Sequence, residues 1–321
     1  MRAVDPPKPE EIARARARIR GVALRTPLLP LDLPDLPVRL HLKLECLQPI
    51  GSFKIRGAMN AMRAADPKAL ERGVYTASAG NMAQGVAWGA RALGIPCTAI
   101  VPEQAPRAKL DAIERLGATV VKVPFTTWWE VLETHGYPGI EGLFVHPVAD
   151  PAVIAGNGTI GLEILEDLPD TEAILVPFGG GGLLSGIAIA AAAMRPATRV
   201  YACEVETAAP LTASLREGSP QTIDHRPSFV DGIGGRSVLP EMWPMVRGLV
   251  EGAIVVTLEE VARAIRLLIE RVRVVAEGAG GASVAAALRG EAEGAKVVCV
   301  VSGGNIDPVK LAAILGGQIP G

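Results

Sequence analysis

The chain has few cysteines, and none is spaced as a redox pair or a metal ligand. The four cysteines form no CxxC motif and stand among apolar residues, at positions 46, 97, 203 and 299. Their spacing to the histidines does not match a zinc module either, at His41, His135, His146 and His225. We therefore predict four buried free thiols, which excludes a disulfide framework.

Long apolar runs and an excess of one charge are also missing. No run of 18 residues is free of charged or turn residues, and the first 20 residues contain no apolar signal core. The 32 basic and 34 acidic residues give a formal net charge of −2 and no basic patch. We expect no membrane segment, no nucleic-acid partner, a cytoplasmic location and a small-molecule substrate.

Lysine is scarce, because only eight of the 32 basic residues are lysine. The chain thus uses arginine for most ordinary cations, and a lysine in an apolar setting stands out. Lys54 lies between Phe53 and Ile55 at the predicted start of a helix. Burial and a helix N-terminus would lower the pKa of its amine, as imine chemistry requires. Taken alone, the position also suits an exposed surface lysine.

Short β-rich runs alternate with Ala- and Leu-rich helical stretches after an amphipathic helix around 8–20, which predicts the α/β class in one or two domains. Most predicted strands are continuous apolar runs, which favours open parallel sheets covered by helices on both faces. Functional residues should follow the strands' carboxyl ends. The predicted strands are Val38–Glu45, Gly73–Ala77, Cys97–Pro102, Ala118–Val123, Ala173–Pro177, Arg199–Val205, Ala253–Thr257 and Lys296–Val301.

Residues 66–147 contain a compact βαβαβ unit, with helices predicted at Asn81–Leu93 and Pro106–Leu116. We predict that this segment is a small mobile domain. Residues 1–65 and 148–321 would then form the large cofactor-binding domain. No repeat of 20–50 residues is evident, which argues against solenoids and propellers.

Four consecutive glycines, Gly179, Gly180, Gly181 and Gly182, follow a predicted strand and open the helix 183–194. Bare amides at a helix N-terminus form an anion site that needs no charged side chain, so we predict a phosphate site. A tight strand-to-helix turn is the structural alternative. A nicotinamide site is weakened but not excluded, because Glu204 and Glu206 lie in the window of an acidic ribose ligand.

Two further segments place polar groups after predicted strands. Ser78-Ala79-Gly80-Asn81 offers amides, a hydroxyl and a carboxamide for a substrate carboxylate. Ser302-Gly303-Gly304-Asn305 follows a buried strand and presents a neutral hydroxyl. In isolation, a helix cap and a turn serine explain these residues equally well.

In this order and combination, the segments resemble the signature set of threonine dehydratases and serine racemases, over nearly the whole chain. The matching segments are Gly51–Ala58, Ser78–Asn81, Gly179–Gly182 and Ser302–Asn305, with support from Arg25–Leu28, Asp231–Ile233 and Glu277–Ala279. The resemblance implies the two-domain fold type II of pyridoxal-phosphate enzymes, similar to the tryptophan synthase β subunit. It also implies pyridoxal 5'-phosphate as the cofactor.

By this resemblance, Lys54 holds the cofactor as a Schiff base and moves the substrate's α-proton. The resemblance implies that the cofactor phosphate would bind at Gly179, Gly180, Gly181 and Gly182 and the ring oxygen at Asn81. The ring faces would lie against Phe53 and Gly232, and the pyridine nitrogen would meet Ser302. Glu277 is also implied as a cofactor-binding residue. The substrate carboxylate would bind at Ser78, Ala79, Gly80 and Asn81. A hydroxyl at Ser302 does not hold the pyridine nitrogen protonated, which favours elimination over transamination.

The implied reaction converts L-threonine to 2-oxobutanoate and ammonia, and L-serine to pyruvate. A serine racemase, or a hydroxyaspartate or serine dehydratase, is the alternative within the family. Ala79 stands where similar racemases carry a second serine, which disfavours racemisation. Met82 replaces a frequent histidine, for which we expect a change in loop packing only. Outside the family, a nucleotide-dependent oxidoreductase or a non-catalytic binding protein would leave Lys54 dispensable.

The resemblance also suggests a divalent cation site at Glu204 and the Ala208 carbonyl. Pro210 stands where an acidic ligand is expected, although Glu206 could substitute and would suit Mg²⁺ or Ca²⁺. A homodimer or homotetramer is the expected assembly. Because the chain ends at Gly321, we expect no regulatory domain and no inhibition by isoleucine.

The assignment of Lys54 gives a first prediction. Lys54→Ala should abolish both turnover and the absorption band of a borohydride-reducible imine, because no other amine would be placed to form it. Spectra of the purified wild type and variant with added cofactor measure this. A variant that keeps a reducible imine and normal activity would show that another lysine is the anchor.

Overall fold

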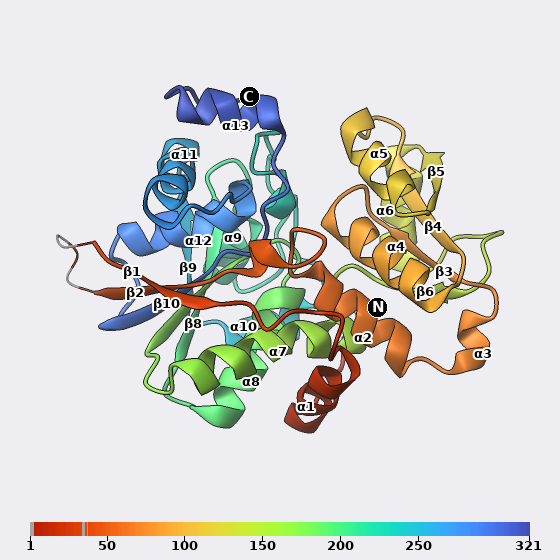
Figure 1. The fold of residues 1–321 in the computed structure, drawn as a ribbon, viewed down its shortest axis with the longest axis horizontal. Coiled ribbons are helices and arrows are strands. Elements are labelled where there is room, and N and C mark those ends of the chain that lie inside the picture. The colour runs from red at the N-terminus through yellow and green to blue at the C-terminus, as the bar shows by residue number, and fades with distance from the viewer. Residues whose placement is uncertain (1–2, 34–35, 37) are drawn as a thin grey trace.

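The computed structural model describes residues 3–33, 36 and 38–321, and these residues form two sheets (Figure 1). The first sheet has the strand order β1-β2-β10-β7-β8-β9 and the second has β5-β4-β3-β6. Except for the antiparallel pair β1 and β2, the neighbouring strands are parallel. The predicted α/β class with open parallel sheets is therefore confirmed.

The strands are β1 Leu28–Leu31, β2 Arg39–Lys43, β3 Val74–Ala77, β4 Cys97–Pro102, β5 Thr119–Val123, β6 Leu143–Phe144, β7 Ala173–Pro177, β8 Arg199–Val205, β9 Gly252–Val256 and β10 Lys296–Val300. The helices are α1 Pro9–Arg18, η1 Glu45–Leu47, α2 Lys54–Ala64, α3 Pro67–Leu70, α4 Asn81–Leu93, α5 Arg107–Arg115, α6 Phe125–Thr134, α7 Pro151–Asp167, α8 Gly182–Met194, α9 Pro210–Glu217, η2 Asp231–Ile233, α10 Trp243–Leu249, α11 Leu258–Leu267, η3 Leu268–Val272, α12 Gly278–Leu288 and α13 Pro308–Leu315.

All eight predicted strands are present, with ends that differ from the prediction by two residues or fewer. The pattern missed β1 and β6. In β1, Pro30 interrupts the apolar run, and a proline is tolerated there because β1 is an edge strand. β6 spans only two residues, which is too short for any period to show.

The first sheet is buried on both faces, because successive residues of its strands alternate between two apolar layers. In β7, Ile174 and Val176 pack with α7, α8 and α10, whereas Leu175 packs with α11 and α12. In Figure 1 these helix groups lie below and above the sheet. Burial on both faces explains why the strands read as continuous apolar runs.

The four strands of the second sheet all lie inside the segment 66–147, which we call the small lobe; the rest of the chain is the large lobe. In β3, Val74 packs in the cluster that contains α4 and α5, whereas Tyr75 and Ala77 pack with α6. Helix α2 contacts both α4 of the small lobe and α7 of the large lobe. The exact domain boundaries stay a prediction.

A buried network of charges joins β2, η1, α2 and α7. Arg56 donates to both oxygens of Glu45 at 2.8 Å and to the two oxygens of Glu163 at 2.7 and 2.8 Å. Lys43 donates to Glu163 at 2.6 Å and to the Thr26 carbonyl at 2.7 Å. The four charged residues are at most 4% exposed. The network is neutral overall, so its charges compensate one another in a region without water.

The four cysteines are free and buried, as predicted. Burial raises the pKa values of the Cys46, Cys97 and Cys299 thiols to about 12, so these thiols stay protonated. In the described part of the chain, no helix combines the length and the apolar character that a membrane crossing requires.

Removing Arg56 should strongly destabilise the fold. Arg56→Met would leave two buried carboxylates with Lys43 as their only nearby cation, which typically costs about 3–5 kcal/mol. Urea titration of the cofactor-free protein measures the free energy of unfolding. The matched control is Arg63→Met on the exposed side of α2, where a change within about 0.5 kcal/mol is expected. Equal effects of the two substitutions would contradict the role of the network.

Candidate active site

Lys54 is the first residue of α2, as the sequence predicts, and its side chain is half-buried. Burial lowers the pKa of the amine to about 8, against a smaller opposing effect of the Glu277 carboxylate. The Nζ atom donates a hydrogen bond to the Pro147 carbonyl at 2.9 Å and lies 5.1 Å from the Phe53 ring centre. Lys54 is therefore not an ordinary surface lysine, and its amine can exchange a proton near neutral pH.

The tetraglycine turn Gly179–Gly182 joins β7 to the N-terminus of α8, and bare backbone is required there. A Cβ atom on Gly180 would lie 2.6 Å from a methyl carbon of Val148. Gly181 has a φ of 96°, in the left-handed region that glycine favours. The turn thus presents amides and a helix N-terminus in a concave arrangement, which suits an anion.

The segment Ser78–Asn81 joins β3 to α4. Gly80 N donates to the Ser78 hydroxyl at 3.2 Å, whereas the amides of Ala79 and Asn81 have no partner among the described residues. Helix α4 also approaches Lys54 closely, because a Cβ atom on Gly85 would lie 3.2 Å from the Lys54 carbonyl carbon. Free amides therefore lie at the amino end of the helix that packs on Lys54, as a carboxylate site requires.

Asn81 begins a hydrogen-bond chain between the two lobes. Its Nδ2 atom donates to Glu277 at 2.8 Å, and its Oδ1 atom accepts from Asn305 at 2.8 Å. Burial raises the pKa of the Glu277 carboxyl group to about 7, with a further contribution from the negative charge of Asp231; the bond from Asn81 acts in the opposite direction. Glu277 is thus a carboxyl group that can be protonated near neutral pH.

Two buried hydroxyls at the end of β10 and before α2 lack partners. The Ser52 hydroxyl has none among the described residues, and no hydrogen bond of the Ser302 hydroxyl is present there either. Phe53 N donates to the Ser302 carbonyl at 3.0 Å, which places Ser302 beside the Lys54 segment. A free buried hydroxyl next to the lysine is available to a ligand.

Gly232 connects these groups. A Cβ atom on Gly232 would lie 3.5 Å from a Glu277 carboxylate oxygen, and one on Gly179 would lie 3.3 Å from the Gly232 carbonyl oxygen. The predicted cofactor and carboxylate segments therefore meet at the carboxyl ends of β3, β7 and β10, as expected for parallel sheets.

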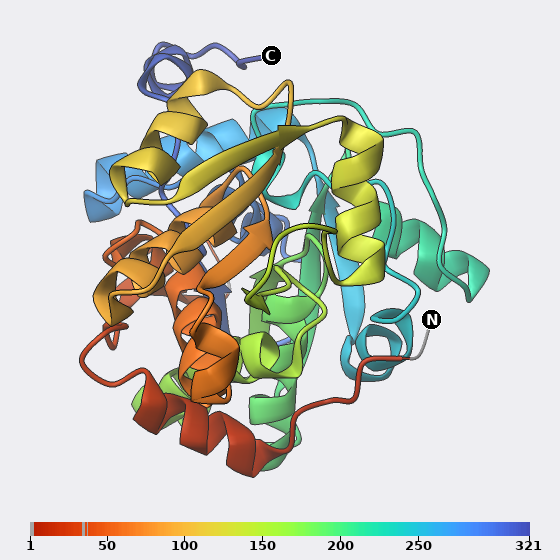
Figure 2. The same cartoon turned by 90° about the vertical axis from the view of Figure 1, so that its right-hand side faces the viewer.

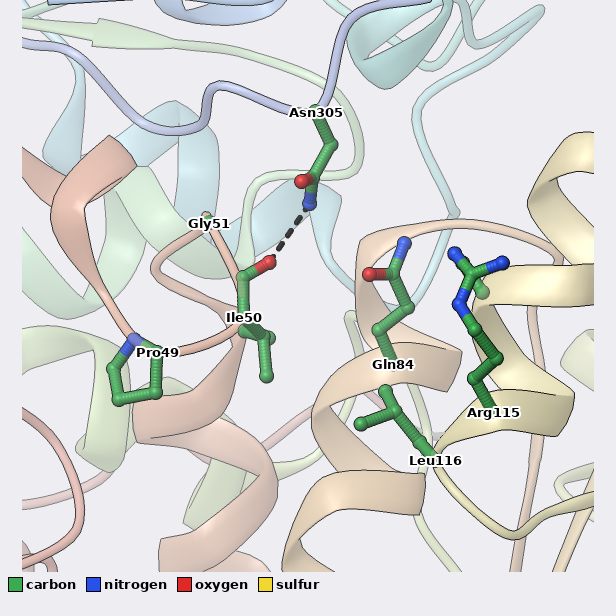
Figure 3. A pocket seen from close by; sticks show the side chains of 8 residues that line it. Pro49, Ile50, Gly51, Gln84, Arg115, Leu116 and Asn305 are labelled. Carbon is green, nitrogen blue, oxygen red and sulfur yellow. Dashed lines mark hydrogen bonds between the residues drawn. The ribbon is translucent and has the colours of Figure 1, made fainter.

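A cavity of about 320 Å³ with a mixed polar and apolar lining lies next to this hydrogen-bond chain, between the lobes (Figure 3). Asn305 enters it from the large lobe and donates to the Ile50 carbonyl at 2.9 Å, whereas Gln84 and Arg115 line it from α4 and α5. Asn305 thus belongs both to this cavity and to the hydrogen-bond chain through Asn81.

The sequence analysis missed the segment His146–Ala149. We assigned these residues no role in the site, yet Pro147 provides the partner of the Lys54 amine and Val148 packs against the glycine turn. A histidine beside a proline carries no sequence signal for such a role. Met82, at 2% exposure, packs in the small-lobe core. The expected change in loop packing stays a prediction.

The suggested cation residues are occupied by hydrogen bonds. Glu204 is buried, and its oxygens accept from the Leu211 amide and from the amide and hydroxyl of Thr212 at 2.6–2.7 Å. Glu206 accepts from the Leu258 amide at 2.9 Å. Glu204 therefore caps the N-terminus of α9. Ala208, whose carbonyl was the second suggested ligand, is buried as well. The Mg²⁺ or Ca²⁺ site stays a prediction.

A half-buried lysine of lowered pKa and a glycine turn at a helix N-terminus, both at the carboxyl edge of parallel sheets, are the features expected of an enzyme that binds a phosphorylated carbonyl cofactor through an imine. The sequence comparison agrees with this class. Residues 19–303 match the family described as "Pyridoxal-phosphate dependent enzyme", and the chain belongs to that family.

Relatives with two different activities are similar to the chain. An L-threonine ammonia-lyase of Thermotoga maritima is 41% identical over 304 residues, covering 93% of this chain and 75% of that protein. Human serine racemase is 39% identical over 309 residues, covering 92% and 91% of the two chains. The structure of maize serine racemase superposes with a TM-score of 0.88 at 32% identity and covers 98% of both chains.

The residues fit pyridoxal phosphate. The glycine turn offers backbone amides at the N-terminus of α8 to a phosphate, the lowered pKa of the Lys54 amine makes its neutral form available, and the Ser302 hydroxyl has no hydrogen-bond partner among the described residues. These three features lie on consecutive strand ends of one sheet, β7 and β10, and on the helix that follows β2. A lysine, an anion site and a hydrogen-bonding hydroxyl are groups that can meet this cofactor at its aldehyde, phosphate and ring nitrogen.

The raised pKa of Glu277 predicts a pH dependence of stability in the cofactor-free protein. The folded-state pKa of about 7 exceeds the ordinary value of 4.5, so the stabilisation is complete below pH 4.5 and is lost as the pH rises through 7. Glu277→Gln removes this loss. Between pH 4.5 and pH 8, the free energy of unfolding of the Glu277→Gln variant minus that of the wild type should therefore increase by about 3 kcal/mol. Urea titrations at four pH values measure this, and a constant difference would contradict it.

Proposed function

We propose that the chain is a pyridoxal-phosphate-dependent ammonia-lyase that converts L-threonine to 2-oxobutanoate and ammonia, and L-serine to pyruvate. The observation that carries the proposal is the Lys54 amine near the glycine turn, combined with Ala79, which has no proton to donate, in the loop that would hold the substrate carboxylate. Elimination needs one base, whereas racemisation needs a second proton donor on the opposite face.

The cofactor supplies an electron-withdrawing ring that makes the substrate's α-proton acidic. Lys54 holds the cofactor and then removes that proton. The amides of Ala79 and Asn81 bind the substrate carboxylate, and Gly179–Gly182 bind the cofactor phosphate. The β-hydroxyl leaves as water, and the hydrolysis that releases ammonia takes up one water, so the net products are the 2-oxo acid and ammonia.

Ser302 and Asn81 would orient the ring. The Ser302 hydroxyl can hydrogen-bond the ring nitrogen without protonating it, which limits how much charge the ring accepts and favours prompt loss of the β-hydroxyl. Asn81 would bond the ring oxygen while Glu277 and Asn305 hold its carboxamide. Phe53 and Gly232 would flank the two ring faces. The similarity to a threonine ammonia-lyase supports this proposal, and the comparable similarity to serine racemases makes racemisation the alternative to test.

The test is an assay of the purified holoenzyme with L-threonine, L-serine and D-serine. We expect 2-oxo acid and an equal amount of ammonia from L-threonine and L-serine, with negligible D-serine from L-serine. Chiral chromatography detects the D-isomer. Substantial D-serine from the wild type would assign the chain to the racemases instead, and no product from either L-amino acid would reject the lyase.

Ala79→Ser should raise the formation of D-serine to a detectable level. The substitution adds a hydroxyl where the wild type has none, and a positioned acid or base typically changes a rate about 10²–10⁴-fold. Serine is also well tolerated next to a helix N-terminus, so the fold should be kept. The same chromatography measures the effect. An unchanged product ratio in a folded, cofactor-loaded variant would mean that position 79 does not control the outcome.

A further inference from the structure

Helix α6 of the small lobe contacts the large lobe along its whole length. At its start, the Phe125 ring lies 5.5 Å from the Arg236 guanidinium carbon; further along, Trp129 packs against the large-lobe core. At its end, His135 Nε2 lies 3.0 and 3.1 Å from the two Glu241 oxygens. Figure 2 shows α6 beside the large-lobe segment that contains these residues. The His135–Glu241 pair is thus the last of these three contacts between α6 and the large lobe.

The backbone of His135 indicates that its side chain has a function. His135 ends α6 in the left-handed conformation, with a φ of 57°, where glycine or asparagine is favoured. A histidine there strains the backbone, and such strain persists only where other contacts compensate it. The Glu241 carboxylate, 6% exposed, supplies one of these contacts.

The second contact of His135 is His146. The two rings stack with centres 4.6 Å apart and planes 27° apart. Nδ1 of His146 accepts hydrogen bonds from the Val148 amide at 3.0 Å and the Ala149 amide at 2.6 Å. Nε2 must therefore carry the ring proton, and it donates to the Leu132 carbonyl of α6 at 3.2 Å. His146 joins α6 to the turn 146–149.

This arrangement excludes a metal at the same place. Ligand atoms of His135, His146 and Glu241 lie within 4.8 Å of one another. A metal needs a nitrogen lone pair from His146, yet Nδ1 is used by two amides and Nε2 is protonated. Burial lowers the pKa of His146 to about 3, which keeps the ring neutral. The cluster is therefore a structural contact.

The turn that His146 holds faces the cofactor site. Its Pro147 carbonyl accepts from the Lys54 amine at 2.9 Å, and Val148 packs against Gly180 and Gly182. A displacement of the turn would move the partner of the catalytic amine and one wall of the phosphate site together. A displacement of α6 can thus be transmitted to Lys54 through the His146 imidazole.

We propose that Glu241, His135 and His146 form an interlobe strut that holds the Lys54 amine in place, with His135 as a positioning residue. This proposal rests on the proposed function in one respect, because the proposed function assigns Lys54 as the catalytic base. When α6 docks on the large lobe, Glu241 fixes the ring of His135, and the stacked His135 ring fixes that of His146. His146 in turn holds the turn 146–149 through the Val148 and Ala149 amides. Lys54 is then aligned only while the lobes are in contact.

His135→Asn tests the strut without weakening the helix end, since asparagine suits the left-handed conformation but cannot stack on His146 or reach Glu241. We expect kcat for L-threonine to fall at least about tenfold with KM within about twofold, because the base is misplaced while substrate binding is kept. In the cofactor-free protein, amide hydrogen exchange of the peptide spanning 146–149 should be at least about tenfold faster. Glu241→Ala should reproduce both changes from the other lobe.

Arg273→Asn is the matched control. Arg273 is the other described non-glycine residue with a positive φ, 65°; it ends η3, and its guanidinium donates to the Ile269 carbonyl of the same helix at 3.1 Å. Its substitution relieves the same kind of strain and should leave kcat and the exchange of 146–149 unchanged. If His135→Asn also leaves both unchanged, the strut is rejected. If the wild type does not deaminate L-threonine, the proposed function fails, while hydrogen exchange still tests the strut.

Discussion

The buried pairing of Arg56 with Glu45 and Glu163 is the interaction on which the site depends. Arg56 lies two residues after Lys54 on α2, so the same helix turn carries the ionic network and the reactive amine. Breaking a buried network of this kind leaves uncompensated charge, which the fold resists. The network therefore fixes α2 against β2 and α7 and gives the Lys54 side chain a rigid support.

The parallel strands bring the other groups of the site to the Lys54 segment. Their carboxyl ends deliver the glycine turn after β7, the hydroxyl after β10 and the amide loop after β3 to one region between the lobes. Helix N-termini follow two of these ends, and their amides favour anions. In the proposed function, backbone amides would therefore bind the phosphate and the carboxylate, and side chains would serve proton transfer and orientation.

Burial sets the proton chemistry of the two ionisable groups at the site. It lowers the pKa of the Lys54 amine to about 8 and raises that of the Glu277 carboxyl to about 7. Both groups thereby change protonation near neutral pH, although an exposed lysine and glutamate would not. The small lobe contributes to this burial through α4, whose Gly85 packs on Lys54 and whose Asn81 bonds to Glu277, so the electrostatics depend on how the lobes pack.

The sequence by itself determined eight of the ten described strands, the lysine at a helix start and the glycine turn. These features depend on local patterns, namely apolar runs, bare amides and one lysine between apolar neighbours. Tertiary structure alone decided which groups meet. The partner of Lys54 is 93 residues away and that of Asn81 is 196 residues away, and the Arg56 network joins residues 107 positions apart. No local pattern specifies such contacts, because they arise only when the two sheets and α2 have packed.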